Sequence, residues 1–423
     1  MEMEFSPRGH YLTSYLHMYI NGKFDADLSE MSLRDLGTFV HEYVHYLQNI
    51  STIFGLRRSE FLYSEMLQIK SDVIKSERLI LPLQIVKPAY MHMTKLFKRC
   101  WGTYRYISDI NPESIIIREE QSEEGLKPHI DYIIEFDSSV GEKEEITFGI
   151  WHIKEGMAFM YQRYFDPGVA KKDDAPYNLV EILGNLFFPS VDTKQLICIC
   201  YTSLFFQHPA EVFFELCRIA EKNPNMPGFE LHRSYLNQQK FGDKSRLYSA
   251  DEYLKITVDR FREKLGRNLI SKLDFISEML NRVIKANIHS PLLTMLYAPG
   301  FPDVTLLDHL VGYYGIPLIE TPHGLHYPSK AHISEKIEMV ISENKEVAAS
   351  FMEVVSDDVV ELIAHRAMNS YLKNPEQCGL ISICLHDNLI DHNCHESPWL
   401  HEPPCMFSVI SSNFNLKDKI KAP

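Results

Sequence analysis

The sequence lacks any apolar run long enough to cross a membrane. Its most apolar stretch, QLICICYTSLFF, covers only residues 195–206, whereas a transmembrane helix needs about 20 apolar residues. A signal peptide is not recognisable either, because residues 1–20 begin with acidic side chains and contain no apolar run followed by a small-residue cleavage site. These absences predict a cytoplasmic protein without a membrane anchor.

Cysteine and basic residues are too few for several classes of protein. Eight cysteines in 423 residues do not resemble the dense disulfide framework of a small secreted protein, which agrees with a reducing compartment. The 43 Lys and Arg residues are outnumbered by 57 Asp and Glu residues, giving a formal net charge of −14. Because binding to phosphates is driven by basic side chains, we expect no general nucleic-acid binding.

What the chain does contain is enough apolar material for a large core, at 45% hydrophobic residues, without internal repeats or low-complexity linkers. Strand-like segments between turn residues occupy 115–150, and helical periodicity predominates after residue 151. We therefore predict an α+β fold, mainly helical, with a small antiparallel sheet. The clearest predicted helices cover 176–186, 209–222, 250–288 and 331–372.

A stretch rich in Pro, Asn and Gly at 223–234 suggests a division of the chain. Residues 1–225 are expected to form one core, into which helices and strands are inserted at about 56–145. Residues 226–423 are expected to form a mostly helical region that ends in a segment rich in Cys and His.

One short motif sets two histidines and a glutamate at a spacing that suits a metal ion. In HEYVHYLQN, residues 41–49, His41 and His45 are four residues apart and Glu42 follows the first. Composition alone gives only about 0.07 accidental H-E-x-x-H matches in such a chain. On a helix, residues i and i+4 share a face, so both imidazoles can bind one ion. Glu42, about 100° around the helix, is placed to hold a water molecule.

The flanking sequence predicts that this motif lies on a helix over about 33–53. Ser32 is a suitable N-cap, Asp35 completes an acidic capping box, and Gly55 is placed to end the helix. Apolar residues at spacings of three and four predict a buried stripe made of Leu36, Val40, Tyr43 and Leu47. The alternative is an ordinary helix with two hydrogen-bonded histidines and no metal.

HEYVH resembles the HExxH signature of the zincin superfamily of zinc metallopeptidases. The resemblance covers only this helix and one later segment. It implies a zincin-like fold, Zn²⁺ as cofactor, and His41 and His45 as metal ligands. It also implies that Glu42 is the general base, which takes a proton from a zinc-bound water before attack on a carbonyl.

A catalytic zinc usually takes three protein ligands, so the chain should supply one more. The metzincin continuation is absent, because YLQNISTIF follows the motif without the expected Gly and His. In ITFGIWHIKEGMAFMYQRYF, the E-G-x-A segment that starts at Glu155 resembles the third-ligand helix of gluzincin-like peptidases, and Glu155 is our prediction. Alternatives are His152, the pair His208 and Glu211 in HPAEVFFEL, or a Glu155 that is only a buried ion-pair partner.

Residues with supporting roles are harder to choose. Candidate donors to the negative oxygen of a hydrolytic reaction are Tyr161, His208, His323 and Tyr327. Asn49, one turn beyond His45, is placed to orient a ligand. In the C-terminal segment, cysteines and histidines gather at Cys378, Cys384, His386, His392, Cys394, His395, His401 and Cys405. Their separations match no common zinc finger, which favours unpaired thiols over a second, structural metal site.

Together these features predict an intracellular zinc-dependent endopeptidase that acts on a protein or peptide substrate, as a regulated effector or toxin-like enzyme. Two alternatives stay open: a noncatalytic zincin-fold binding or scaffold protein, and a metal-dependent amidohydrolase of a small substrate. The intact Glu42 favours an enzyme, because a general base has no use without catalysis.

Overall fold

The structure is a computed structural model that describes most of the chain. The described residues are 4–6, 8–12, 16–25, 27–77, 79, 81–82, 88–122, 129–138, 141–242, 246–269, 273–286, 288–328, 339–342, 357–373, 378, 394, 397–398, 406–412 and 416–419. Within these ranges, none of the helices combines the length and hydropathy that crossing a bilayer requires.

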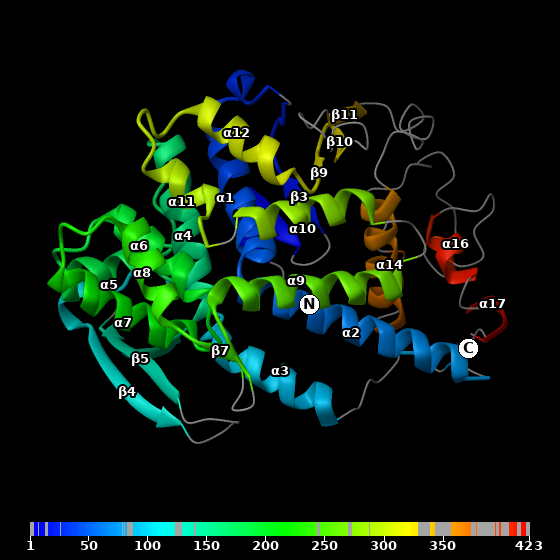
Figure 1. The fold of residues 1–423 in the computed structure, drawn as a ribbon, viewed down its shortest axis with the longest axis horizontal. Coiled ribbons are helices and arrows are strands. Elements are labelled where there is room, and N and C mark those ends of the chain that lie inside the picture. The colour runs from blue at the N-terminus through cyan, green and yellow to red at the C-terminus, as the bar shows by residue number, and fades with distance from the viewer. Residues whose placement is uncertain are drawn as a thin grey trace.

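The protein has the predicted mainly helical α+β fold (Figure 1). Its principal described helices are α1 (Leu33–Ser51), α2 (Ile53–Lys75), α3 (Pro88–Trp101), α4 (Ile150–Phe165), α5 (Leu179–Phe187), α6 (Thr193–Ser203), α7 (Pro209–Lys222), α8 (Gly228–Gln238), α9 (Ala250–Asn268), α10 (Asp274–Ala286), α11 (Pro291–Leu296), α12 (Val304–Tyr314), α14 (Asp357–Lys373), α16 (Met406–Ser412) and α17 (Leu416–Lys419). The described strands are β1 (Glu4–Ser6), β2 (Gly9–Leu12), β3 (His17–Ile20), β4 (Ile116–Ser122), β5 (His129–Asp137), β6 (Lys143–Phe148), β7 (Phe241–Gly242), β8 (Leu247–Tyr248), β9 (Leu318–Thr321), β10 (Gly324–Pro328) and β11 (Met339–Ser342).

The described strands form three sheets, of which the smallest is the pair β7–β8. The predicted antiparallel meander is confirmed as β4–β5–β6, in which Tyr132 of β5 pairs with Glu119 on one side and Phe148 on the other. A mixed sheet was not predicted: its order is β1-β2-β3-β9-β10-β11, and β3 pairs parallel to β9. This sheet joins the first twenty residues to strands more than 300 residues later, a pairing that local patterns cannot indicate.

Helix predictions held where periodicity and end signals agreed. The helix expected over 209–222 is α7, with Pro209 in its first turn. The single helix expected over 250–288 is two helices, α9 and α10, with residues 270–272 outside the described ranges. Of the helix expected over 331–372, α14 covers the final part, β11 occupies part of the rest, and the remainder lies outside the described residues.

The N-terminal end of α1 was predicted correctly and its C-terminal end was not. The Ser32 hydroxyl accepts a hydrogen bond from the Asp35 amide at 3.1 Å, as the capping box requires. However, α1 ends at Ser51, and the extended residue Thr52 caps the start of α2 by accepting from the amide of Gly55 at 3.1 Å. Gly55 therefore lies in the first turn of α2 and does not end α1.

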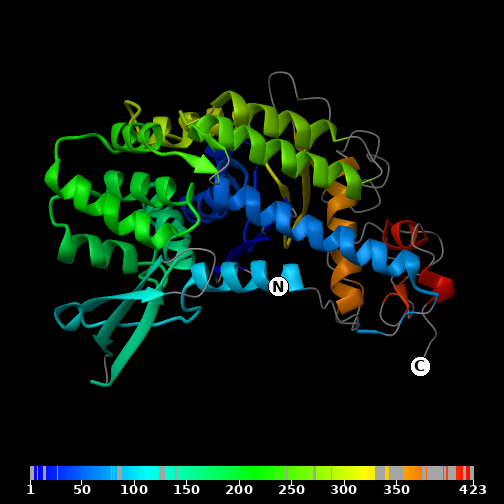
Figure 2. The ribbon, with the colours of Figure 1, turned by 60° about the horizontal axis from the view of Figure 1, so that its bottom comes forward.

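Helix α1 is the central element of the fold, and the views in Figures 1 and 2 show helices around it. It packs against α2, α4, α10 and the strands β2 and β3. Its side chains from Leu36 to Ser51 are all buried, so the predicted apolar stripe is buried together with the polar stripe beside it. Buried polar side chains need a hydrogen-bond partner or a metal ion. This requirement applies to the two histidines of α1.

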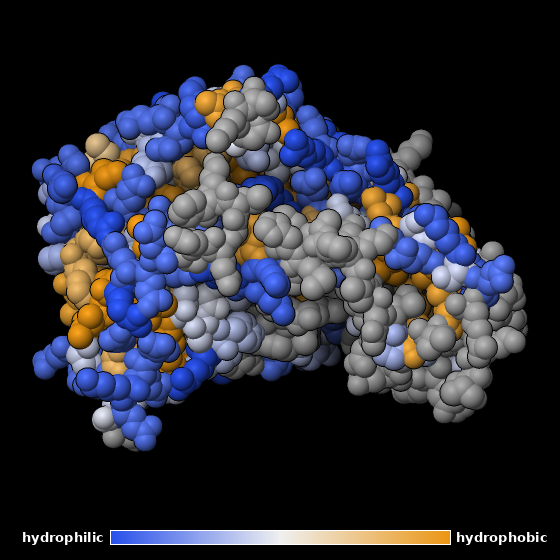
Figure 3. All heavy atoms as spheres, turned by 90° about the horizontal axis from the view of Figure 1, so that it is seen from below, coloured by the Kyte–Doolittle hydropathy of each residue, from blue (hydrophilic) through white to orange (hydrophobic). Residues whose placement is uncertain are grey.

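A second core lies at the far end of α2, where Ile69 and Val73 pack on Met368 and Tyr371 of α14 and on Phe407 of α16. In Figures 1 and 2, α14 crosses this end of α2. The main core includes residues from both sides of the expected boundary near 225, and that boundary stays a prediction. On the face seen in Figure 3, most of the coloured surface is hydrophilic, and the apolar areas on it are separate from one another.

Candidate metal centre

Helix α1 presents His41 and His45 on one buried face. The two side chains are each 1% exposed, and their ring centroids are 4.9 Å apart with the rings nearly perpendicular. One helical turn separates the two residues, which is why the rings lie side by side. The predicted helical placement of the pair is therefore confirmed.

Helix α4 brings Glu155 to the same point. The chain leaves β6 at Phe148 and enters α4 at Ile150, so the predicted change from strand to helix is confirmed. Glu155 Oε2 lies 3.3 Å from His41 Nε2, and Glu155 Oε1 lies 3.5 Å from His45 Nε2. The Glu155 side chain is 2% exposed.

These distances fit a metal ion. Ligand atoms about 2.1 Å from a tetrahedral zinc lie about 3.4 Å from one another. The two contacts to the carboxylate are close to this value, and one donor atom from each of the three residues lies within 4.8 Å of the other two. Among the described residues, these three form the group whose donor atoms converge in this way. The protein thus has a buried His–His–Glu site able to hold a metal ion.

The protonation of the site suits a cation. Burial lowers the pKa of His41 most, the nearby charge of Lys172 adds to this effect and Glu155 opposes it, so that the pKa falls from 6.5 to about 3. Burial alone would raise the pKa of Glu155, but His45 and His41 outweigh it, so the carboxyl pKa lies below its ordinary value. A neutral imidazole and an ionised carboxylate are the forms that bind metals.

Gln48 fixes the orientation of His45. Its side-chain oxygen lies 2.9 Å from His45 Nδ1, and its side-chain nitrogen donates to the Lys154 carbonyl at 3.1 Å. Because an amide oxygen can only accept, His45 Nδ1 carries the proton and Nε2 keeps the lone pair that faces Glu155. Gln48 thus has the role expected of Asn49, whose side chain contacts the hydroxyls of Tyr11 and Ser59.

Glu42 is fully buried beside the triad and outside it, as predicted. The first residue of β2, Gly9, lies against its carboxylate: a Cβ atom on Gly9 would be 2.8 Å from Glu42 Oε1 and 2.9 Å from the Tyr19 carbonyl oxygen. Only glycine lets the strand pass this close to the carboxylate. This contact could not be predicted from local patterns, because Gly9 and Glu42 meet only in the folded chain.

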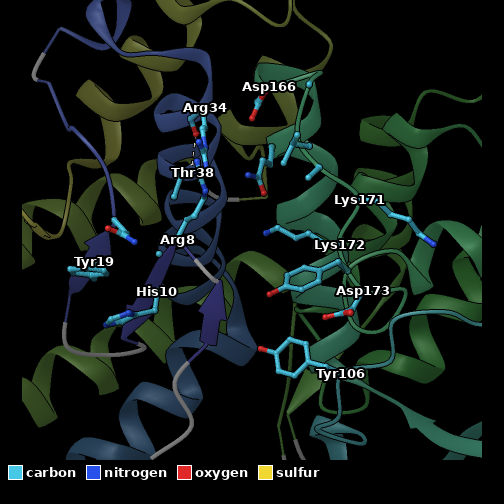
Figure 4. A pocket seen from close by; sticks show the side chains of 17 residues that line it. Arg8, His10, Tyr19, Arg34, Thr38, Tyr106, Asp166, Lys171, Lys172 and Asp173 are labelled. Carbon is cyan, nitrogen blue, oxygen red and sulfur yellow. Dashed lines mark hydrogen bonds between the residues drawn. The ribbon is translucent and has the colours of Figure 1, made fainter.

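A cavity of about 1110 Å³ adjoins the site. One wall comes from the N-terminal strands and α1, and the other from Tyr106, the end of α4 and the segment that follows it (Figure 4). Thr38, one turn before His41, lines the cavity, as do Gly9 and Tyr177, whose ring centroid is 6.0 Å from that of His41. The three donor residues themselves lie just behind the wall.

The alternative ligands are elsewhere. His152 Nδ1 accepts a hydrogen bond from the Gly149 amide at 3.2 Å and so helps to start α4. His208 precedes α7, where its ring stacks on His129 with centroids 4.3 Å apart. Neither it nor Glu211 belongs to the converging group.

Of the candidate donors for a negative oxygen, Tyr161, His208 and His323 are not among the residues that line the cavity. The Tyr161 hydroxyl is buried and donates to the Leu292 carbonyl at 3.1 Å. His323 is exposed, and the side chain of Tyr327 lies outside what the structure describes. Polar groups that do line the cavity include Lys172, Tyr177, Tyr106 and Gln162. Sequence analysis assigned none of them to the site. Lys172 and Tyr177 lie in KKDDAPY, residues 171–177, which has no motif or periodicity.

Most of the C-terminal cysteine and histidine cluster lies outside the described residues: Cys384, His386, His392, His395, His401 and Cys405. Two members are described, Cys378 and Cys394, and both are buried. The Cys378 amide donates to the Cys394 carbonyl at 2.9 Å, so the backbones of these two segments meet.

Comparison with known proteins returns no matching family model, curated protein or solved structure. The geometry of the site and the local resemblance of residues 41–45 are therefore what supports a metal centre.

Proposed function

We propose that the protein is an intracellular zinc-dependent endopeptidase that hydrolyses peptide bonds of a protein substrate. The observation that carries the proposal is the meeting of His41, His45 and Glu155 at distances suited to a tetrahedral ion, with Glu42 buried beside them. A carboxylate beside such a site, outside the ligand set, has the position of a general base.

The assignment of roles follows from charge. A zinc ion bound by these residues would lower the pKa of its water toward about 7 and polarise a carbonyl. Glu42 would accept the water proton and later deliver it to the leaving amine. Gln48 would hold His45 in the tautomer that leaves Nε2 unprotonated.

The size of the cavity accommodates a segment of polypeptide as well as a small amide. Pockets for small ligands are typically about 300–1,000 Å³, and this one reaches about 1110 Å³ between two walls. The small-substrate amidohydrolase remains the second candidate, because the same residues would hydrolyse any amide that reached Glu42.

The first test is metal content. Full-length protein should bind about one zinc per chain, and His41→Ala or Glu155→Ala should lower zinc affinity strongly because each removes a ligand. His289→Ala changes an exposed histidine and should leave zinc content unchanged. Elemental analysis after dialysis measures this, and wild-type protein that takes up no zinc, cobalt or manganese would contradict the proposal.

The second test separates the base from the ligands. Glu42→Gln keeps the size of the side chain but cannot accept a proton, so it should retain zinc and lose activity by a factor of about 10² or more. Glu113→Gln, which changes an exposed glutamate, is the matched control. New protein N-termini, counted by mass spectrometry after incubation with a cell extract, give the readout.

Each outcome of the second test has a clear meaning. Cleavage by wild type and Glu113→Gln, but not by Glu42→Gln, supports the proposal. Equal cleavage by Glu42→Gln excludes the mechanism. Zinc binding without cleavage by any of the three proteins favours the noncatalytic alternative.

A further inference from the structure

Lys172 differs in its surroundings from the neighbouring cation Lys171. It follows α4 in the segment of residues 166–177, and its side chain points into the cavity in Figure 4, whereas the neighbouring Lys171 points away. Lys171 Nζ lies 3.2 Å from an Asp109 oxygen and 3.4 Å from an Asp174 oxygen. Adjacent lysines thus have opposite environments, and only Lys171 is held by carboxylates at close range.

The Lys172 ammonium is buried, and within the described part of the chain it has no hydrogen-bond partner. It lies 4.3 Å above the ring centroid of Tyr177 and 5.2 Å from that of Phe159. Such cation–π contacts stabilise the charge but leave its three N–H donors unused. A buried ammonium without an acceptor costs free energy, which a bound acceptor would recover.

Lys172 lies close to both the cavity and the triad, because its ammonium contacts the ring of Tyr177, whose centroid is 6.0 Å from that of His41. It lines the cavity, and its charge acts on Glu155, Glu42 and His41 behind the wall. The ammonium is therefore available to an anion that binds in the cavity beside the triad. Other polar groups that line the cavity are the Tyr177 and Tyr106 hydroxyls, which are hydrogen-bonded to each other, and the buried Gln162 side-chain oxygen, which has no partner in the described ranges.

We propose that Lys172 is a binding site for an anionic oxygen beside the metal centre. This inference rests on the proposed function, in which the anion is the oxygen of the attacked carbonyl. As the water oxygen bonds to the carbonyl carbon, the C=O π electron pair moves to the carbonyl oxygen, and Lys172 Nζ donates a hydrogen bond to it. When this electron pair re-forms the C=O bond, the C–N bond breaks. Glu42 then gives the proton that it took from the water to the amine nitrogen.

A substrate carboxylate offers the same chemistry in the ground state. Both anions would bind at Lys172, but they affect kinetics differently. Stabilising only the transition state raises kcat, whereas holding a substrate carboxylate lowers KM for acidic substrates.

The principal test uses anion binding, so it does not depend on finding a substrate. Cobalt-loaded full-length protein is titrated with phenylphosphonate, and the visible cobalt spectrum is followed. Lys172→Met should weaken phosphonate binding about tenfold or more, as expected for a lost hydrogen bond to a charged group. Lys172→Arg should restore most of the affinity, and Lys171→Met is the matched control that should bind as wild type does.

Two further measurements exclude a purely structural role. Cobalt content should be equal in all four proteins, and the metal-free Lys172→Met protein should melt at the same or a higher temperature, because a buried unpartnered charge is removed. Phosphonate binding unchanged in Lys172→Met, or lost to the same extent in Lys171→Met, would overturn the inference. A melting temperature well below that of wild type would assign Lys172 to folding instead.

The source of the anion is read from kinetics once cleavage is measured. A loss in kcat of about 10²-fold in Lys172→Met, with little change in KM, assigns the site to the carbonyl oxygen. A rise in KM confined to acidic substrates assigns it to a carboxylate. If cobalt does not bind at all, the proposed function is refuted. If cobalt binds normally but the Lys172 variants behave as wild type does, only the inference about Lys172 is refuted.

Discussion

At the scale of single residues, Gln48 shows how a neutral side chain controls a metal-binding group. It accepts the Nδ1 proton of His45 and donates to the Lys154 carbonyl, so the imidazole cannot rotate without breaking one of two buried hydrogen bonds. Partners of this kind set the tautomer and orientation of a ligating histidine.

We expect Gln48→Leu to weaken zinc binding by about 10- to 100-fold, because it leaves His45 Nδ1 without an acceptor and frees the ring. The comparison is Asn49→Ala, which removes the neighbouring buried amide with its contacts to Tyr11 and Ser59. That change should lower stability without changing zinc affinity. Competition with a zinc-sensitive dye measures both variants, and equal affinities in the two would show that Gln48 does not orient the ligand.

At the scale of elements, the junction between α1 and α2 determines where the metal-binding helix stops. Thr52 interrupts the helix with an extended conformation, and its hydroxyl donates to the Gln48 carbonyl at 2.6 Å while accepting from the Gly55 amide. The start of α2 is thereby folded against the last turn of α1. A Cβ atom on Gly55 would lie 2.5 Å from the Gln48 carbonyl oxygen.

Gly55→Ala should therefore lower the free energy of unfolding by about 1–3 kcal/mol, the usual cost of an atom forced into packed structure. The matched control is Gly312→Ala in α12, where an added Cβ meets nothing within 4 Å. There, alanine should be neutral or stabilise by up to about 1 kcal/mol through its higher helix propensity. Thermal melts compare the two, and equal melting temperatures would refute the close approach at Gly55.

At the scale of the whole molecule, folding encloses several histidines in neutral form. Burial lowers the pKa of His41 and His152 from 6.5 to about 3, with Glu155 opposing in both cases, and burial lowers the pKa of His232 to about 4. In the unfolded chain these histidines become protonated near pH 6.5, whereas in the folded chain they stay neutral to a lower pH. Folded-state pKa values below the unfolded ones mean that stability is lost as pH falls below about 6.5.

We expect the metal-free protein to lose about 2 kcal/mol per such histidine between pH 7 and pH 5. His152→Asn keeps an acceptor for the Gly149 amide and removes one titrating group. Its stability should therefore fall less steeply with acid than that of wild type, by up to about 1.4 kcal/mol per pH unit. His323→Asn, at an exposed position, is the control. Urea unfolding at several pH values decides the matter, and parallel curves for wild type and His152→Asn would contradict the assignment.

The sequence by itself determined the local parts of the candidate site. Capping by Ser32, the i and i+4 spacing of His41 and His45, and the change from strand to helix before Glu155 are properties of short segments. Their physics depends on neighbours within a few residues. Helix α7 and the β4–β5–β6 meander were predicted for the same reason, because periodicity and turn residues act locally.

Only the tertiary structure decided which distant residues surround the metal centre. Gly9 reaches Glu42 because β2 packs beside α1, and Lys172 reaches the cavity from a segment without periodicity. The pairing of β3 with β9 joins residues some 300 positions apart. Such contacts depend on how whole elements pack around one core. In that packing, shape and burial bring together residues that are far apart in the sequence, so local patterns do not reveal them.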